Sequence, residues 1–307
     1  MDRGSQDNVQ RSAFSVQLGC SGISTLYALR STLLLLLVVV VMLAGGCVTQ
    51  VFPTAKVCPG KADVAEALDA LHQQAKAAVP FRTNGQCRLG FVTESGKTRQ
   101  FNLPVSVYIN PPSEIYLQGQ ATPGPQGLVF LGTNERQFWL GLRPEISTFW
   151  WGDWSKATKG HDLPVSPRAV FESFGFAGAD SFETDPNHWS LSAGPGQDVL
   201  TWTGQNGLPI KRIFVDRCDY RIARIEYLDE AGHVTVMVEL KGYQRVADGF
   251  FVPSQVSIVA FAEGQRTHWA RMTLGAFMEK EYNDQFRSRY FVRPEPRGFE
   301  TVIEVDG

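Results

Sequence analysis

The sequence lacks a membrane-spanning helix, an excess of basic charge and the short motifs of common enzymes. The apolar run from Leu33 to Leu43 is shorter than the roughly 20 residues that a helix needs to cross a bilayer. A formal net charge of −2 provides no basic field, which argues against nucleic acid as a partner. No Cys-x-x-Cys, His-Glu-x-x-His or nucleophile-elbow motif occurs, and the histidines are scattered. We therefore expect no metal, no cofactor and no catalytic residue, so that the protein is not an enzyme.

The segment from Arg30 to Cys47 has the layout of a secretory signal. A basic residue precedes the apolar run, and the small residues Ala44-Gly45-Gly46 follow it, directly before Cys47. This order resembles the lipobox of bacterial lipoproteins, in which the cysteine receives lipid and the signal is removed. We therefore predict that residues 1–46 are a leader and signal that is cut off, and that Cys47 is lipidated. An ordinary secretory peptide or an uncleaved anchor is the alternative.

The composition after Cys47 suits a globular protein. Hydrophobic residues make up 43% of the chain and charged residues 20%, which is enough to build an apolar core. We expect a lipidated tether over residues 47–58 and one domain over residues 59–307. Stable anchoring would follow from two or more acyl chains, each gaining about 0.8 kcal/mol per buried CH₂ group.

Three of the five cysteines remain in the predicted exported domain, where the setting is oxidising. Cys58 lies just before a predicted helix and Cys87 lies in the first predicted strand. We predict a disulfide between Cys58 and Cys87, with Cys218 as a small buried side chain. Three free thiols are the alternative.

One amphipathic helix precedes a long series of predicted strands. Val64, Leu68 and Leu71 recur at helical spacing, Gly60 can cap the helix, and Pro80 ends it. From residue 84 onward, apolar residues alternate with polar ones between turn signals such as Asn206-Gly207 and Asp248-Gly249, a pattern that predicts antiparallel hairpins.

A second, short helix is predicted to interrupt these strands. Ser166 and Pro167 can begin it and Gly175 can end it. The predicted fold class is α+β: a strongly curved antiparallel sheet, or half-barrel, with the N-terminal helix and the inserted short helix on its concave side.

Four stretches resemble the LolA/LolB-like superfamily of bacterial envelope proteins. They are a proline-led strand, a hairpin with an aromatic return strand, a late hairpin that ends in proline, and a closing segment: Pro111–Leu117, Leu128–Trp139, Tyr243–Pro253 and Phe291–Val305. The resemblance spans most of the chain after Cys47, and each motif is one of strand and turn chemistry.

The resemblance implies a function. A half-barrel of this kind would hold acyl chains, so the protein would be a membrane-anchored carrier or acceptor of lipid or of lipoprotein acyl chains, such as palmitate. Val48 follows the cysteine without an acidic retention signal, which favours the periplasmic side of the outer membrane. The alternatives are a structural or assembly lipoprotein that binds an envelope protein partner and, with the least support, an enzyme acting on envelope lipid or glycan.

Aromatic residues on the predicted strands are the candidates for lining the lipid cavity. Consecutive strand residues face opposite ways, so Trp150 and Trp151 cannot both point inward. Packing in the ordinary core is the alternative role for each of them. The candidates are Phe130, Phe138, Trp139, Phe149, Trp150 and Trp151.

Overall fold

The computed structural model describes residues 58–92, 96–120, 128–143, 146–155, 163, 166–176 and 185–305. These residues all belong to one compact unit, Lys56–Gly307. The predicted signal, Cys47 and all of the tether before Cys58 lie outside the described residues, so the cleavage and lipidation remain predictions.

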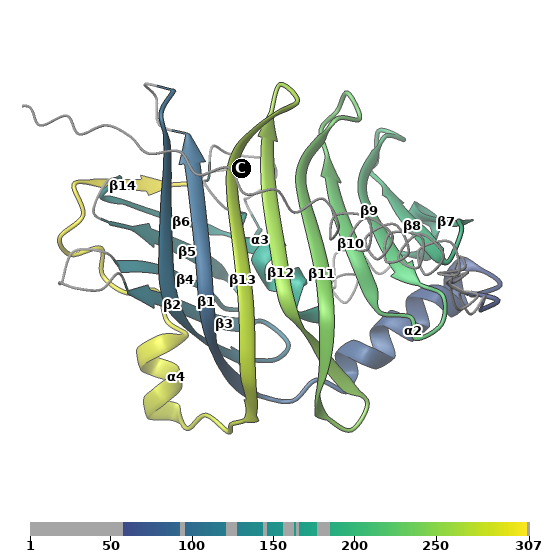
Figure 1. Cartoon of the computed structure of the whole chain (residues 1–307), viewed down its shortest axis with the longest axis horizontal. Helices are drawn as coiled ribbons and strands as arrows, with labels where there is room; N and C mark the ends of the chain where they lie inside the picture. The colour runs from purple at the N-terminus through teal and green to yellow at the C-terminus, as the bar shows by residue number, and fades with distance from the viewer. Residues whose placement is uncertain are drawn as a thin grey trace, which may run out of the picture. The chain divides into compact units, whose positions relative to one another are not determined.

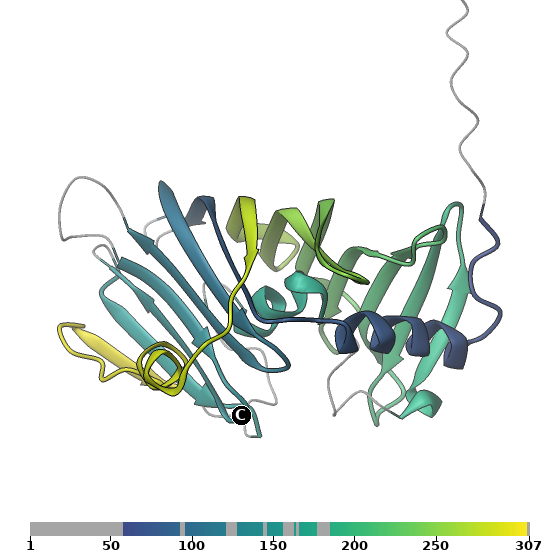
Figure 2. The same cartoon turned by 90° about the horizontal axis from the view of Figure 1, so that it is seen from below.

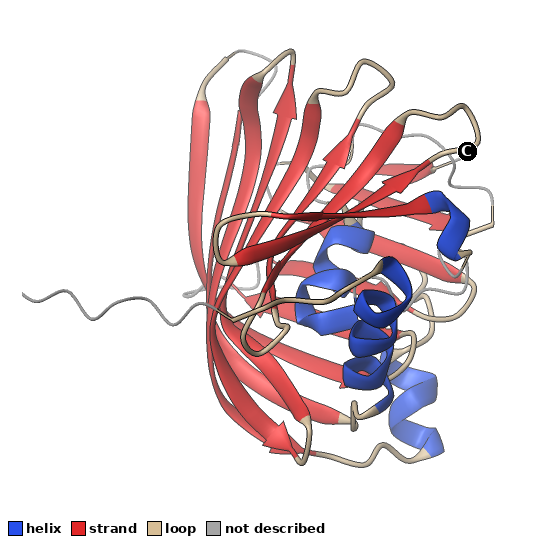
Figure 3. Ribbon diagram, turned by 90° about the vertical axis from the view of Figure 1, so that its right-hand side faces the viewer, coloured by secondary structure: helices blue, strands red, loops and turns tan. Residues whose placement is uncertain are grey.

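The described part of the chain is mostly β and forms one sheet of fourteen strands (Figures 1 and 3). The strand order is β14-β6-β5-β4-β3-β2-β1-β13-β12-β11-β10-β9-β8-β7. All neighbours pair antiparallel except β14 and β6, which are parallel, so the sheet is mixed. The strands are β1 (Phe81–Val92), β2 (Thr98–Asn110), β3 (Glu114–Gln120), β4 (Leu128–Thr133), β5 (Gln137–Leu142), β6 (Thr148–Asp153), β7 (Trp189–Ala193), β8 (Gln197–Thr203), β9 (Pro209–Asp216), β10 (Ile222–Leu228), β11 (Val234–Ala247), β12 (Phe250–Ala262), β13 (Gln265–Glu279) and β14 (Thr301–Glu304).

The sheet consists of two consecutive meanders that meet at β1 and β13. Strands β1–β6 follow one another in the chain, as do β7–β13. The turn between β12 and β13 contains Glu263 and Gly264, both with positive φ, as a tight hairpin turn requires. The predicted turns at Gly207 and Gly249 also have positive φ. These observations confirm the hairpins that the turn signals predict.

Within the described ranges, three α-helices accompany the sheet. They are α2 (Val64–Lys76), α3 (Pro167–Phe171) and α4 (Asp284–Tyr290), with the short helical turns η1 (Glu172–Phe176) and η3 (Pro186–His188). Asp63, rather than Gly60, caps α2 by accepting a 2.8 Å hydrogen bond from the Glu66 amide. Ser166 caps α3 as predicted, by accepting a 3.2 Å hydrogen bond from the Ala169 amide.

Helices α2 and α3 share one core with the sheet. Leu68 of α2 and Val170 of α3 are buried with alternate residues of nearly every strand, including Leu131 of β4. We call the face of the sheet that this core covers the inner face. A smaller cluster of Phe130 and its neighbours covers the opposite, outer face of β3–β6, because Phe130 and Leu131 are consecutive and point to opposite sides.

The C-terminal segment lies along the outer face and was not predicted as helical. Asn283 caps α4 by accepting a 2.8 Å hydrogen bond from the Phe286 amide. Phe286 and Tyr290 of α4 stack on Tyr108 of β2, at ring distances of 5.3 and 5.8 Å. Figure 2 shows α4 and β14, in yellow, beside the strands of the first meander.

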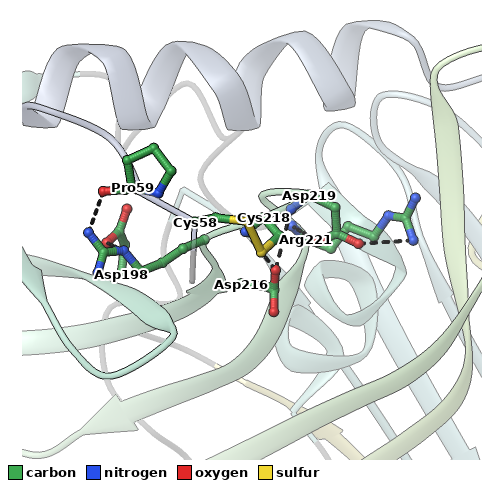
Figure 4. The surroundings of a disulfide bond; sticks show 8 residues. Cys58, Pro59, Asp198, Asp216, Cys218, Asp219 and Arg221 are labelled. Atoms are coloured by element: carbon green, nitrogen blue, oxygen red, sulfur yellow. Dashed lines mark hydrogen bonds and ion pairs between the residues drawn. A yellow bond between two sulfur atoms is a disulfide. The ribbon is translucent and has the colours of Figure 1, made fainter. Parts of the chain in front are cut away.

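The predicted disulfide between Cys58 and Cys87 is wrong. Cys58 is bonded to Cys218, with the two Cα atoms 5.0 Å apart (Figure 4), and Cys87 is a buried free thiol. The 13 residues of α2 extend about 20 Å and separate Cys58 from the start of β1. The disulfide therefore joins the segment before α2 to the turn after β9, a neighbour that no local sequence pattern indicates.

Candidate functional site: an apolar pocket on the inner face

One apolar pocket lies among the described residues between the inner face of the sheet and α3. Its empty space is about 930 Å³, including the solvent at its mouth. Strands β1–β5, β12 and β13 supply most of the lining, and Val170 supplies the contribution of α3. The lining residues are Cys87, Leu89, Gly90, Phe91, Phe101, Leu103, Val105, Leu117, Val129, Leu131, Leu140, Leu142, Arg143, Ile146, Val170, Ile258, His268, Trp269, Ala270 and Met272.

The two-residue period of the strands places these side chains together. Phe101, Leu103 and Val105 alternate along β2, and the exposed residues between them, Asn102 and Pro104, point to the outer face. Leu140 and Leu142 of β5 continue the same apolar surface two strands beyond β3. No carboxylate lies among the lining residues. The described lining therefore suits an apolar ligand better than a polar substrate.

A buried ion pair holds the segment of α3 and η1 against the sheet. Glu172 and Lys211 are each 2% exposed, and the Lys211 Nζ lies 2.7 Å from the Glu172 Oε2. The Tyr227 hydroxyl donates a 2.6 Å hydrogen bond to the same oxygen. Arg168 adds a contact of 3.6 Å between its Nε and the other carboxylate oxygen. This network fixes the position of Val170, which lines the pocket.

The buried thiol of Cys87, in the pocket lining, should make the free energy of unfolding of the protein depend on pH. Burial raises the pKa of its thiol from 9.0 to about 12. The unfolded chain therefore loses this proton before the folded chain does, and the free energy of unfolding should fall as the pH rises from about 9 to about 12. Below about pH 9 both states keep the proton, and this group has no effect.

Urea unfolding measured at about pH 8 and about pH 10.5 checks this prediction. The variant Cys87→Ala should lose less stability between the two pH values than the wild type does. Equal losses would contradict the role of the thiol. Burial also raises the pKa of Tyr116 to about 12. This group lowers the free energy of unfolding at high pH in the wild type and in the Cys87→Ala variant alike, so it does not affect the comparison.

The six aromatic candidates lie away from this pocket. Phe130, Trp139 and Phe149 form the cluster on the outer face, and Trp151 packs beside them under the Arg293 guanidinium. Phe138 and Trp150 belong to the main core. None of the six lines this pocket, so the prediction that they line a lipid cavity does not apply to this pocket.

Glycines explain why the largest rings collect on the outer face. A Cβ atom on Gly132 would lie 2.2 Å from the Trp139 indole, and one on Gly141 would lie 2.5 Å from the Phe130 ring. Each ring therefore lies over a glycine of the adjacent strand. The aliphatic lining of the pocket was missed, although Leu103-x-Val105 and Leu140-x-Leu142 carry the alternation that could have indicated it.

Two further findings concern metal ions and membrane-spanning helices in the described residues. No group of three or more His, Cys, Asp or Glu side chains in the described ranges is placed to hold a metal ion. Across the same ranges, no helix is long and apolar enough to cross a membrane.

Neither a protein-family model nor a curated protein sequence matches the chain. Solved structures that are similar to it include the following three. A LolA superfamily protein from Nitrosomonas europaea shares 11% identity over 73% of this chain and 97% of its own, with a TM-score of 0.47. A DUF1329 family protein from Desulfovibrio piger shares 11% identity over 75% of this chain and 97% of its own, with a TM-score of 0.45.

The third similar structure comes from Vibrio parahaemolyticus and is provisionally named an outer membrane lipoprotein-sorting protein domain. It shares 10% identity over 74% of this chain and 95% of its own, with a TM-score of 0.42. One of the three similar structures is thus described as a LolA superfamily protein, the superfamily that four stretches of the sequence resemble.

Proposed function

We propose that this protein binds the acyl chain of a lipid or of a lipidated protein in the apolar pocket and keeps it out of water. The observation that carries the proposal is the lining itself, which is aliphatic or aromatic at nearly every described position and contains no carboxylate among the described residues. Burial of apolar surface gains about 25 cal/mol per Å², so an acyl chain needs no chemical step to be held there.

The proposal includes an anchor and a shape for the domain. The sheet would curve into a half-barrel around the pocket, with α2 and α3 on its concave side. A lipidated Cys47 would tether the domain of residues 59–307 to a membrane, facing the periplasm from the outer membrane. The bound lipid or lipoprotein would then be received or passed on at that membrane.

Native mass spectrometry of the unit Lys56–Gly307, secreted into a bacterial periplasm, tests the proposal. We expect the folded protein to carry about one acyl-chain species per molecule, because we assign one ligand to the apolar pocket on the inner face. Extraction of the same sample identifies the lipid. A folded protein that carries no lipid, and that takes up no hexadecanoic acid when it is offered, would contradict the proposal.

A second candidate function rests on the edge strand β14. All four of its residues are exposed, Val302 by 48% and Ile303 by 40%, and β6 is its only strand neighbour in the described part of the chain. Such an edge can pair with a strand of another protein. This observation favours an envelope protein partner, and a stoichiometric complex crosslinked through residues 301–304 would support it.

A further inference from the structure

Two arginines flank one tryptophan on the outer face of β13, and a third, Arg88, lies on the neighbouring strand β1. Trp269 pairs with Gly90 and Arg271 pairs with Arg88 in the register of these strands. The Arg266 and Arg271 guanidinium carbons lie 4.8 and 5.5 Å from the centre of the Trp269 ring. We call Arg88, Arg266, Trp269 and Arg271 the arginine–tryptophan surface.

The strand register fixes which way this surface points. Ala270 and Met272 are buried on the inner face, so Trp269 and Arg271, which alternate with them, point outward. A Cβ atom on Gly90 would lie 2.2 Å from the Trp269 indole, so the ring rests on the bare backbone of Gly90. The indole therefore has a defined position between the guanidinium groups of Arg266 and Arg271.

Among the described residues, the arginine–tryptophan surface carries positive charge without a matching carboxylate. None of its arginines forms an ion pair with another residue in the described ranges, and all three are exposed. The cross-strand neighbours Asn102, Ser257 and Val259 are uncharged. The nearest acids in the ladder are Glu239, which pairs with Lys241, and Glu263 in the adjoining turn.

The two arginines that pair across the strands make the arrangement unfavourable without an anion. Like charges directly opposite each other destabilise a sheet, and Arg88 and Arg271 occupy such opposite positions. Guanidinium groups bind phosphate through paired hydrogen bonds. A tryptophan with an exposed edge favours the boundary between water and lipid.

We propose that the arginine–tryptophan surface docks on the phosphate headgroups of an anionic membrane. The whole chain has a formal net charge of −2, so the positive charge of this surface is a local feature. The surface therefore orients the protein on an anionic membrane and does not give the whole protein a general affinity for anions. Trp269 and Gly90, whose side of the strands is the outer face, are also among the residues that border the pocket, and Phe91 and His268 lie next to them at the same ends of β1 and β13. Docking brings this end of the pocket to the lipid surface, while the headgroup contacts themselves do not depend on a ligand in the pocket.

The test uses the full chain reconstituted in lipid nanodiscs that contain a lipid with a photoactivatable headgroup. Discs with about 30% phosphatidylglycerol are compared with discs of phosphatidylcholine alone, and crosslinked peptides are mapped by mass spectrometry. We expect peptides 86–92 and 265–273 to be labelled about tenfold more in the anionic discs, and about 0.5 M salt to remove the difference.

The triple variant Arg88→Gln, Arg266→Gln, Arg271→Gln should reduce this labelling to the level of the neutral discs. A matched variant with Arg136→Gln, Arg245→Gln and Arg289→Gln removes the same charge from the turn between β4 and β5, from the end of β11 and from α4, and should label as the wild type does. Thermal unfolding shows whether both variants are folded, and the single variant Arg266→Gln, at an exposed position near the start of β13, replaces the triple variant if that one is not.

Equal labelling in both kinds of disc would overturn the proposal, as would a triple variant that labels like the wild type. Crosslinking of the same peptides to a protein in whole envelopes, with no lipid adduct, would also overturn it and assign the surface to a protein partner. Peptides 86–92 and 265–273 also contain residues of the pocket lining, so their labelling alone does not separate docking from acyl-chain binding. The salt dependence and the triple variant do, because Arg88, Arg266 and Arg271 are not lining residues. A triple variant that loses the anionic labelling but still carries an acyl chain would leave the proposed function standing, and the reverse result would leave the docking surface standing.

Discussion

Replacing Lys211 by methionine should lower the free energy of unfolding by about 3–5 kcal/mol, because it leaves the buried Glu172 carboxylate without its cation. Both side chains are 2% exposed and their charged atoms are 2.7 Å apart. Urea unfolding measures the change. The same segment carries Val170, so the variant should also bind acyl chains more weakly.

Two control variants separate the buried charge from other effects. Lys241→Met removes an exposed lysine whose ion pair with Glu239 is long, 3.9 Å, and should change stability by less than about 0.5 kcal/mol. The double variant Glu172→Leu, Lys211→Met removes both charges and should recover much of the loss. A Lys211→Met protein as stable as Lys241→Met would contradict the importance of this pair for holding α3 and η1.

Replacing Ala270 by phenylalanine should weaken acyl-chain binding by about tenfold or more. Ala270 is buried on β13 and lines the pocket, so a larger side chain there occupies the space of the ligand. A chain that loses contact over about 60 Å² loses about 1.5 kcal/mol, which corresponds to about tenfold in affinity. Titration of the unit Lys56–Gly307 with a fluorescent hexadecanoic acid measures the effect.

The matched control is Thr273→Phe, an exposed position on the outer face of the same strand. It should bind as the wild type does. Because a phenylalanine in a packed site can also prevent folding, Val129→Phe at a half-buried position of the lining provides a second variant. Unchanged affinity in both pocket variants, with both folded, would contradict binding in this pocket.

Local patterns predicted the elements whose signals lie close together in the chain. The caps and apolar spacing around Val64 and Ser166 indicated α2 and α3, and the turn glycines indicated the hairpins. Helix α4 was missed because its seven residues show no more than one turn of apolar spacing, at Phe286 and Tyr290. Its place on the outer face depends on Tyr108, which is distant in the sequence.

The pairing of β1 with β13 could not be predicted from local patterns, since their residues lie far apart in the chain. This pairing decides which side chains share the inner face at the centre of the sheet, and so determines the pocket. The six aromatic candidates do not line this pocket, because Trp139 and Phe130 face outward over glycines of neighbouring strands and others pack in the core. The partner of Cys58 is likewise a residue of the second meander, 160 residues away in the sequence.

Photo-crosslinking in living bacteria tests acyl-chain binding most directly. Cells that express the full chain are fed a hexadecanoic acid with a photoreactive group along its chain, irradiated, and the labelled peptides of the purified protein are mapped. We expect adducts on peptides 87–91, 101–105 and 268–272, which line the pocket, and none on peptide 284–290 of α4. Labelling confined to the peptide that contains Cys47, or spread equally over pocket and α4 peptides, would contradict acyl-chain binding in the pocket.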